Sequence, residues 1–118
     1  MDLITQTQEF KEHADKLKEM YVKNDPPENR RDKDFFLKVK AYTEPIYELL
    51  EKWEDNALQV VKERKVNLHP QQVTSTKENM GLLLMHSFYI DVKRKRYMEL
   101  NHSVNFILDQ LLEDLQQQ

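Results

Sequence analysis

Residues 35–61 read FFLKVKAYTEPIYELLEKWEDNALQVV. The apolar residues of this stretch recur at alternating steps of three and four, which is the spacing of one face of an α-helix. They are Phe35, Val39, Tyr42, Ile46, Leu49, Trp53, Ala57 and Val60. The series predicts a long helix over about residues 31–64. Pro45 lies inside it without shifting the apolar phase, so we expect a kink near Thr43, with a break into two helices as the alternative.

The same spacing on either side of this stretch predicts three further helices, over about residues 3–23, 70–90 and 92–115. Pro70 suits the first turn of the third helix, and Asp91 is the expected N-cap of the fourth. Short connections favour antiparallel neighbours. We therefore expect an all-α, single-domain, up-and-down four-helix bundle spanning residues 1–118. Its core should contain aromatic side chains, namely Phe35, Tyr42, Trp53 and Phe88.

The composition agrees with an all-helical chain, because it holds one glycine, Gly81, and no cysteine. Glycine inside a helix costs about 1 kcal/mol relative to alanine. Either a neighbouring helix approaches closely at Gly81, or the cost is tolerated.

Charge and hydropathy exclude several classes of protein. The formal net charge of -3 argues against general nucleic-acid binding. No run reaches the roughly 20 apolar residues of a membrane span, so we expect no membrane insertion. The first 16 residues carry acid where a signal peptide needs base, and without cysteine there is no disulfide. These features suit a cytoplasmic protein.

Residues 69–100, HPQQVTSTKENMGLLLMHSFYIDVKRKRYMEL, and residues 108–112, LDQLL, resemble the YppE-like family, a group of small uncharacterised proteins of low-GC Gram-positive bacteria. The resemblance is specific over about residues 67–112. It implies an all-helical bundle in the bacterial cytoplasm. It implies no activity, cofactor or catalytic residue.

Glu99 and His102 have the Glu-x-x-His spacing found in di-iron bundles, and Glu78 could reach the level of His102. A complete site needs a second Glu-x-x-His pair and two further glutamates, which the sequence lacks as a pattern. We therefore expect no metal or other cofactor, and we identify no catalytic residue.

Four consecutive cations, Lys93, Arg94, Lys95 and Arg96, stand where the fourth helix should begin, although the helix dipole disfavours positive charge there. An up-and-down bundle brings the first connection, with Arg30 and Arg31, to the same end. We expect Arg96, next to the core residue Tyr97, to pair with an internal acid. Otherwise these charges form either a solvated surface or a docking site.

Two functional hypotheses follow. The first is a non-enzymatic helical interaction protein, or adaptor, whose basic end binds an acidic protein or a phosphate-bearing partner. The second is a metal-dependent bundle enzyme that uses a Glu/His site. The first agrees better with the incomplete ligand set, so an enzyme is the less favoured reading.

Overall fold

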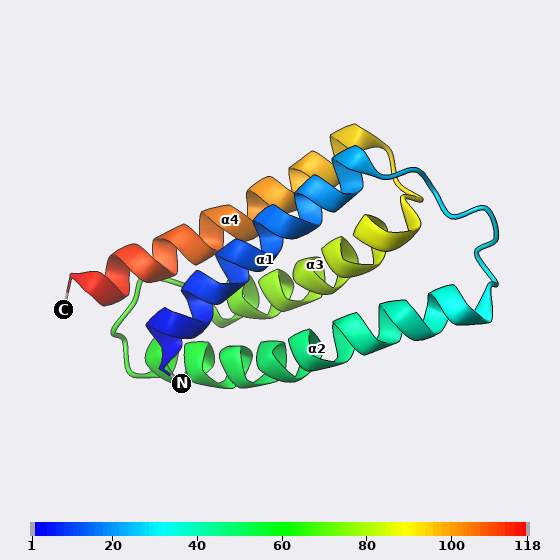
Figure 1. Ribbon diagram of the computed structural model, residues 1–118. Coiled ribbons are helices and arrows are strands. Elements are labelled where there is room, and N and C mark those ends of the chain that lie inside the picture. The colour runs from blue at the N-terminus through cyan, green and yellow to red at the C-terminus, as the bar shows by residue number, and fades with distance from the viewer. Residues whose placement is uncertain (1, 118) are drawn as a thin grey trace.

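The computed structural model describes residues 2–117, and these form four α-helices. They are α1 (Leu3–Lys23), α2 (Lys33–Lys62), α3 (Pro70–Tyr89) and α4 (Arg94–Gln116). Successive helices run in opposite directions (Figure 1). The predicted all-α up-and-down bundle is confirmed.

Side chains and turns at the helix ends set bounds that differ from the predicted ones. Asp32 caps α2, its Oδ1 accepting hydrogen bonds from the backbone N–H groups of Asp34 at 2.9 Å and Phe35 at 3.3 Å. The helix therefore begins at Lys33, two residues later than its apolar spacing predicts. It ends at Lys62 rather than residue 64, because Arg64 adopts a left-handed conformation with φ of 59°.

The start of α4 also differs from the prediction, which placed Asp91 at the N-cap. The N-cap is Lys93, and the helix begins at Arg94. Asp91 is unavailable for capping because its carboxylate lies 2.7 Å from Nδ1 of His86 on α3. At the start of α3, Gln72 Oε1 accepts the backbone N–H of the N-cap residue His69 at 2.9 Å.

Helix α2 continues through Pro45, so the alternative of two separate helices is wrong. The ribbon of α2 curves along its length in Figure 1. Pro45 is exposed, whereas Thr43 and Ile46 beside it are buried. The proline therefore faces away from the core, and the apolar stripe keeps its phase across it.

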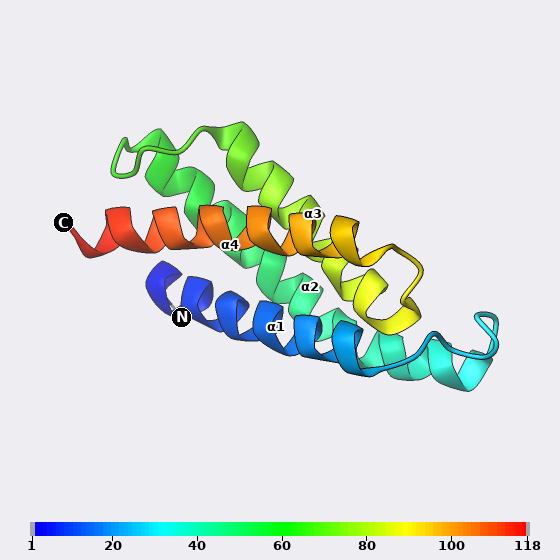
Figure 2. The same cartoon turned by 90° about the horizontal axis from the view of Figure 1, so that it is seen from above.

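The backbones of α1 and α3 approach each other across the bundle, while those of α2 and α4 lie farther apart within the described residues. The connections 24–32 and 90–93 lie at one end and connection 63–69 lies at the other (Figures 1 and 2). Both views show the first turns of α2 extending beyond the end of α1. This overhang positions the surfaces described below.

The core is centred on Trp53, which is 0% exposed. Its ring meets Phe10 edge-on with centroids 6.1 Å apart, and its Nε1 donates to Thr7 Oγ1 at 3.0 Å. The expectation that Tyr42 is a core residue is wrong, because its side chain is 37% exposed. It lies where α2 approaches the overhang, and its ring contacts that of Phe88 with centroids 5.1 Å apart.

Gly81 lies on α3 beside α2, and the structure supports the second of the two readings of this residue. A Cβ atom added there would lie 3.7 Å from the nearest heavy atom outside its own helix, Cε1 of Tyr47, which is an ordinary van der Waals distance. Nothing at this position requires the absence of a side chain. The glycine therefore lowers helix stability and does not allow a closer approach of α2 in compensation.

We predict that Gly81→Ala raises the free energy of unfolding by about 0.5 to 1 kcal/mol, because alanine restricts the unfolded chain and favours the helix. Urea denaturation followed by circular dichroism measures the change. A variant less stable than the wild type would show that α2 and α3 approach more closely than described.

Candidate functional site

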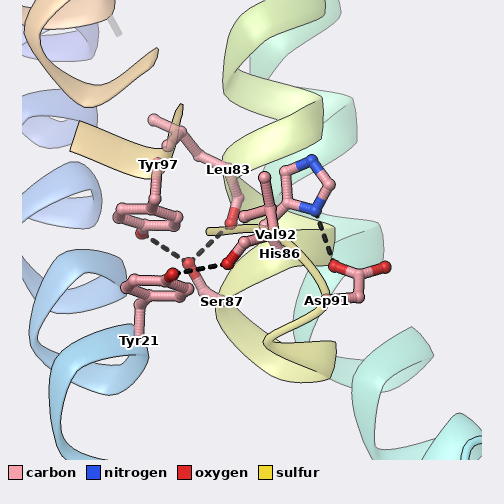
Figure 3. Close-up of polar contacts among 7 residues, drawn as sticks. All are labelled: Tyr21, Leu83, His86, Ser87, Asp91, Val92 and Tyr97. Atoms are coloured by element: carbon pink, nitrogen blue, oxygen red, sulfur yellow. Dashed lines mark hydrogen bonds and ion pairs between the residues drawn. The ribbon is translucent and has the colours of Figure 1, made fainter. Parts of the chain in front are cut away.

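The turn between α3 and α4 is shaped by Ile90, which adopts a left-handed conformation with φ of 49° and ψ of 48°. Its backbone N–H donates to the carbonyl oxygen of His86 at 2.9 Å and so closes the end of α3. His86 and Asp91 then join across the turn through the 2.7 Å contact between Nδ1 and Oδ1 (Figure 3). These contacts fix the direction in which the chain enters α4.

Two stacked tyrosines hold the start of α4 against α1 and α3. The rings of Tyr21 and Tyr97 are nearly parallel, at 2°, with centroids 4.0 Å apart. The Tyr21 hydroxyl donates to the carbonyl oxygen of Val92 at 2.6 Å, as Figure 3 shows. Ser87 Oγ donates to the carbonyl oxygen of Leu83 at 2.6 Å, so its single proton is used and the Tyr97 hydroxyl must donate to Ser87 Oγ, also at 2.6 Å.

Burial raises the pKa of Tyr97 to about 12, above its ordinary value of 10.0. Between pH 10 and about pH 12 the unfolded chain releases this phenolic proton while the folded chain keeps it. Stability should therefore fall as pH rises through this window, and Tyr97 should add no pH dependence below it. Urea denaturation across the window should show a shallower fall in Tyr97→Phe, with part of the slope remaining because burial also raises the pKa of Tyr47. Equal slopes in the two proteins would contradict the assignment.

Four cations surround the first turn of α4 on this scaffold. Lys93 occupies the N-cap and Arg94, Lys95 and Arg96 follow it, and all four are exposed. No side chain caps the helix, and its first turn contains no acidic residue. Within residues 2–117 no acidic side chain forms an ion pair with any of the four. The internal acid expected for Arg96 is therefore not found.

Arg30 and Arg31, in the connection 24–32, lie at the same end of the molecule and are exposed. Neither has an ion-pair partner in the part of the chain that the structure describes. Figures 1 and 2 show that this connection reaches farther out than the turn between α3 and α4. We call the surface formed by Arg30, Arg31 and residues 93–96 the basic end.

The structure adds two apolar residues near Arg30 and Arg31 that sequence analysis did not single out. Phe36 and Leu37, in the first turns of α2, are 53% and 49% exposed. Both lie on the overhang, where α1 no longer covers α2 (Figures 1 and 2). The available sequence signal was that both fall outside the three-and-four apolar series.

The metal candidates are Glu78 on α3 and Glu99 and His102 on α4, and each of them is exposed. No group of three or more His, Asp or Glu side chains within residues 2–117 has an arrangement that could hold a metal ion. The Glu-x-x-His spacing of α4 is thus not joined by a further ligand.

Comparison with known proteins bears on the whole chain. A family described as "Bacterial domain of unknown function (DUF1798)" matches residues 7–115. The chain belongs to this family. The similarity is therefore not confined to residues 67–112, where the sequence motifs are most specific.

One curated relative is the uncharacterized protein YppE of Bacillus subtilis (strain 168), which is 25% identical over 114 residues. The match covers 96% of this chain and 91% of that protein. The crystal structure of the B. subtilis protein superimposes with a TM-score of 0.86, covering 98% of this chain and 93% of that one. The predicted resemblance to YppE-like proteins is confirmed, and these relatives carry no described activity.

Among the described residues, none of the helices combines the length and the apolar character needed to cross a membrane.

Proposed function

We propose that this protein is a non-enzymatic interaction module that binds an acidic protein through its basic end. The observation that carries the proposal is the set of six exposed cations, from the connection 24–32 and the start of α4 at one end of the bundle, that lack acidic partners among the described residues. Ion pairs are present elsewhere on the surface, such as Lys77 with Glu54 at 3.2 Å. Cations without an ion pair among the described residues also occur elsewhere, as at Lys52, Lys62 and Arg64, but the basic end is where six of them lie together.

The position of the cations makes an acidic partner favourable. Lys93, Arg94 and Lys95 repel one another and stand at the positive end of the α4 dipole. Carboxylates of a partner would offset both the mutual repulsion and the unfavourable interaction with the helix dipole. They could also accept hydrogen bonds from the free backbone N–H groups of the first turn. Such complementary charge mainly increases association rate and selectivity.

Phe36 and Leu37 supply the apolar contact that charge alone does not provide. Binding energy at protein interfaces concentrates in a few buried apolar or aromatic side chains surrounded by a polar rim. Exposed apolar groups beside Arg30 and Arg31 fit that pattern. The partner should therefore present acidic residues around an apolar surface.

No observation favours the metal-dependent enzyme in the same way. Its candidate ligands Glu78, Glu99 and His102 are exposed, and within residues 2–117 they do not form a group of three that could hold a metal ion.

Affinity capture from the native cell extract tests the proposal. The triple variant Lys93→Gln, Arg94→Gln, Lys95→Gln should fail to retain a protein that the wild type retains, because it loses three of the unpaired cations. The same change should raise helix stability slightly, since it removes positive charge from a helix N-terminus. Denaturation of both proteins confirms that loss of capture is not loss of folding.

A matched control removes three charges away from the basic end, where Lys52 and Lys62 are exposed on the second half of α2 and Arg64 is exposed just beyond it. Their replacement by glutamine should leave capture unchanged. Equal capture by the wild type and both triple variants would overturn the proposal. Retention of a nucleic acid or a phosphate-bearing lipid in place of a protein would also contradict it.

A further inference from the structure

A groove between α1 and α2 lies away from the six cations of the basic end. It consists of two adjoining hollows of about 370 Å³ and about 360 Å³ that share Lys16 and Tyr42. The first hollow is lined by Glu9, His13, Lys16, Tyr42, Pro45, Ile46 and Leu49. The second continues along α1 past Met20 to Asn24.

Two side chains of the first hollow hold polar atoms that are left without a partner. Glu9 and His13 are four residues apart on α1, which places them side by side on the same face. Glu9 Oε2 and His13 Nδ1 have almost no accessible surface, and neither forms a hydrogen bond within the described residues. A buried carboxylate oxygen or imidazole nitrogen without a partner is destabilising, so rotation of these two side chains toward a ligand that supplies hydrogen-bond donors is favoured.

The charge state of His13 makes it a second acceptor. Burial lowers the pKa of His13; the negative charges of Glu9 and Glu12 oppose this shift, and Lys16 adds to it. The imidazole is therefore neutral near pH 7, with one ring nitrogen free to accept a hydrogen bond. A carboxylate and a neutral imidazole on neighbouring turns form a pair of acceptors with one negative charge.

The remaining walls suit a side chain that carries donors on an apolar stem. Pro45, Ile46 and Leu49 offer aliphatic contact, and the ring of Tyr42 offers an aromatic face. A guanidinium group has several donors in a planar fork and stacks on aromatic rings, whereas an ammonium group is a compact, strongly hydrated charge.

We propose that the first hollow binds the guanidinium group of an arginine side chain from a partner polypeptide, with Glu9 and His13 as its acceptors. The second hollow gives the neighbouring residues of that polypeptide a surface along α1. Lys16 is the opposing charge in the groove and weakens the site. This arginine site is independent of the basic end, which repels a cationic ligand.

Titration of the full-length protein with N-acetyl-arginine amide tests this site. In ¹H–¹⁵N NMR spectra of the wild type, the probe should shift the resonances of Glu9, His13 and Tyr42 and leave those of residues 93–96 unchanged. Glu9→Gln keeps the side-chain shape but removes the charge, and should weaken binding about tenfold. Asp15→Asn, at an exposed position on the same helix, is the matched control and should bind as the wild type does.

Two further titrations distinguish specific binding at this site from a general attraction of cations to the protein surface. Lys16→Gln should tighten binding, because it removes the repelling charge. N-acetyl-citrulline amide, the neutral isostere of the probe, should bind about tenfold more weakly than the arginine derivative. Absence of localised shifts in the wild type would overturn the proposal. So would wild-type affinity for the citrulline derivative or for the corresponding lysine amide that equals its affinity for the arginine derivative. Unchanged affinity of Glu9→Gln for the arginine derivative would overturn it as well.

Discussion

Replacing Trp53 with alanine is expected to lower the free energy of unfolding by about 3 to 5 kcal/mol. The indole ring is 0% exposed and is the largest fully buried side chain of the described core. Its removal would open a cavity beside Phe10. It would also leave the Thr7 hydroxyl without the indole N–H that it accepts at 3.0 Å.

Urea denaturation of the wild type and Trp53→Ala, followed by circular dichroism, measures this loss. Phe106→Ala is the matched control, because Phe106 lies on α4 with 60% of its side chain exposed and should cost less than about 0.5 kcal/mol. A loss below about 1 kcal/mol for Trp53→Ala would place the indole outside the core.

Tyr97→Ala is the second change for which we expect a large effect, again about 3 to 5 kcal/mol of unfolding free energy. The ring is 0% exposed, stacks on Tyr21 and joins α4 to Ser87 on α3. Its loss should loosen the turn that carries the basic end. Faster amide hydrogen exchange at Val92 and Lys93 should accompany the loss of stability.

Tyr97→Phe separates the ring from its hydroxyl. Phenylalanine keeps the stack, and Ser87 Oγ keeps its bond to the carbonyl oxygen of Leu83, so we expect a cost of only about 1 kcal/mol. If phenylalanine costs as much as alanine, the hydroxyl network rather than ring packing holds this end of the bundle together.

Much of the fold could be predicted because helical periodicity reports the buried face directly. The four apolar series identify the four helices, and Trp53 is the residue where this reasoning is most secure. Periodicity does not report how far a neighbouring helix extends. Phe36 is exposed because α1 ends at Lys23 while α2 extends past it, and this depends on the relative shift of the two helices. Tyr42 is exposed for another reason, because it lines a groove beside Lys16 and Met20 of α1.

The start of α4 could not be predicted for a different reason. Asp91 is a favourable N-cap by residue type, but it contacts His86, which is five residues earlier in the chain. This contact depends on Ile90, a residue type that rarely adopts the left-handed conformation found here. Such a turn is determined by tertiary contacts, including the bond from Tyr21 to Val92.

One candidate site could be predicted from the sequence and the other could not. The cations of residues 93–96 are adjacent in the sequence, so their position at a helix start was predictable. The hollow at Glu9 and His13 depends on which face of α1 meets Pro45, Ile46 and Leu49 of α2. Sequence spacing brings Glu9 and His13 together but does not show that one polar atom of each is left without a partner.

The dissociation constant of the captured acidic partner, measured at low and high ionic strength, tests the central claim most directly. Between about 0.05 M and about 0.3 M salt the wild-type constant should rise about tenfold, because screening weakens attraction between exposed charges. The Lys93→Gln, Arg94→Gln, Lys95→Gln variant should bind more weakly at low salt and respond less to added salt. Equal dissociation constants for the two proteins, unchanged by salt, would contradict binding through the basic end.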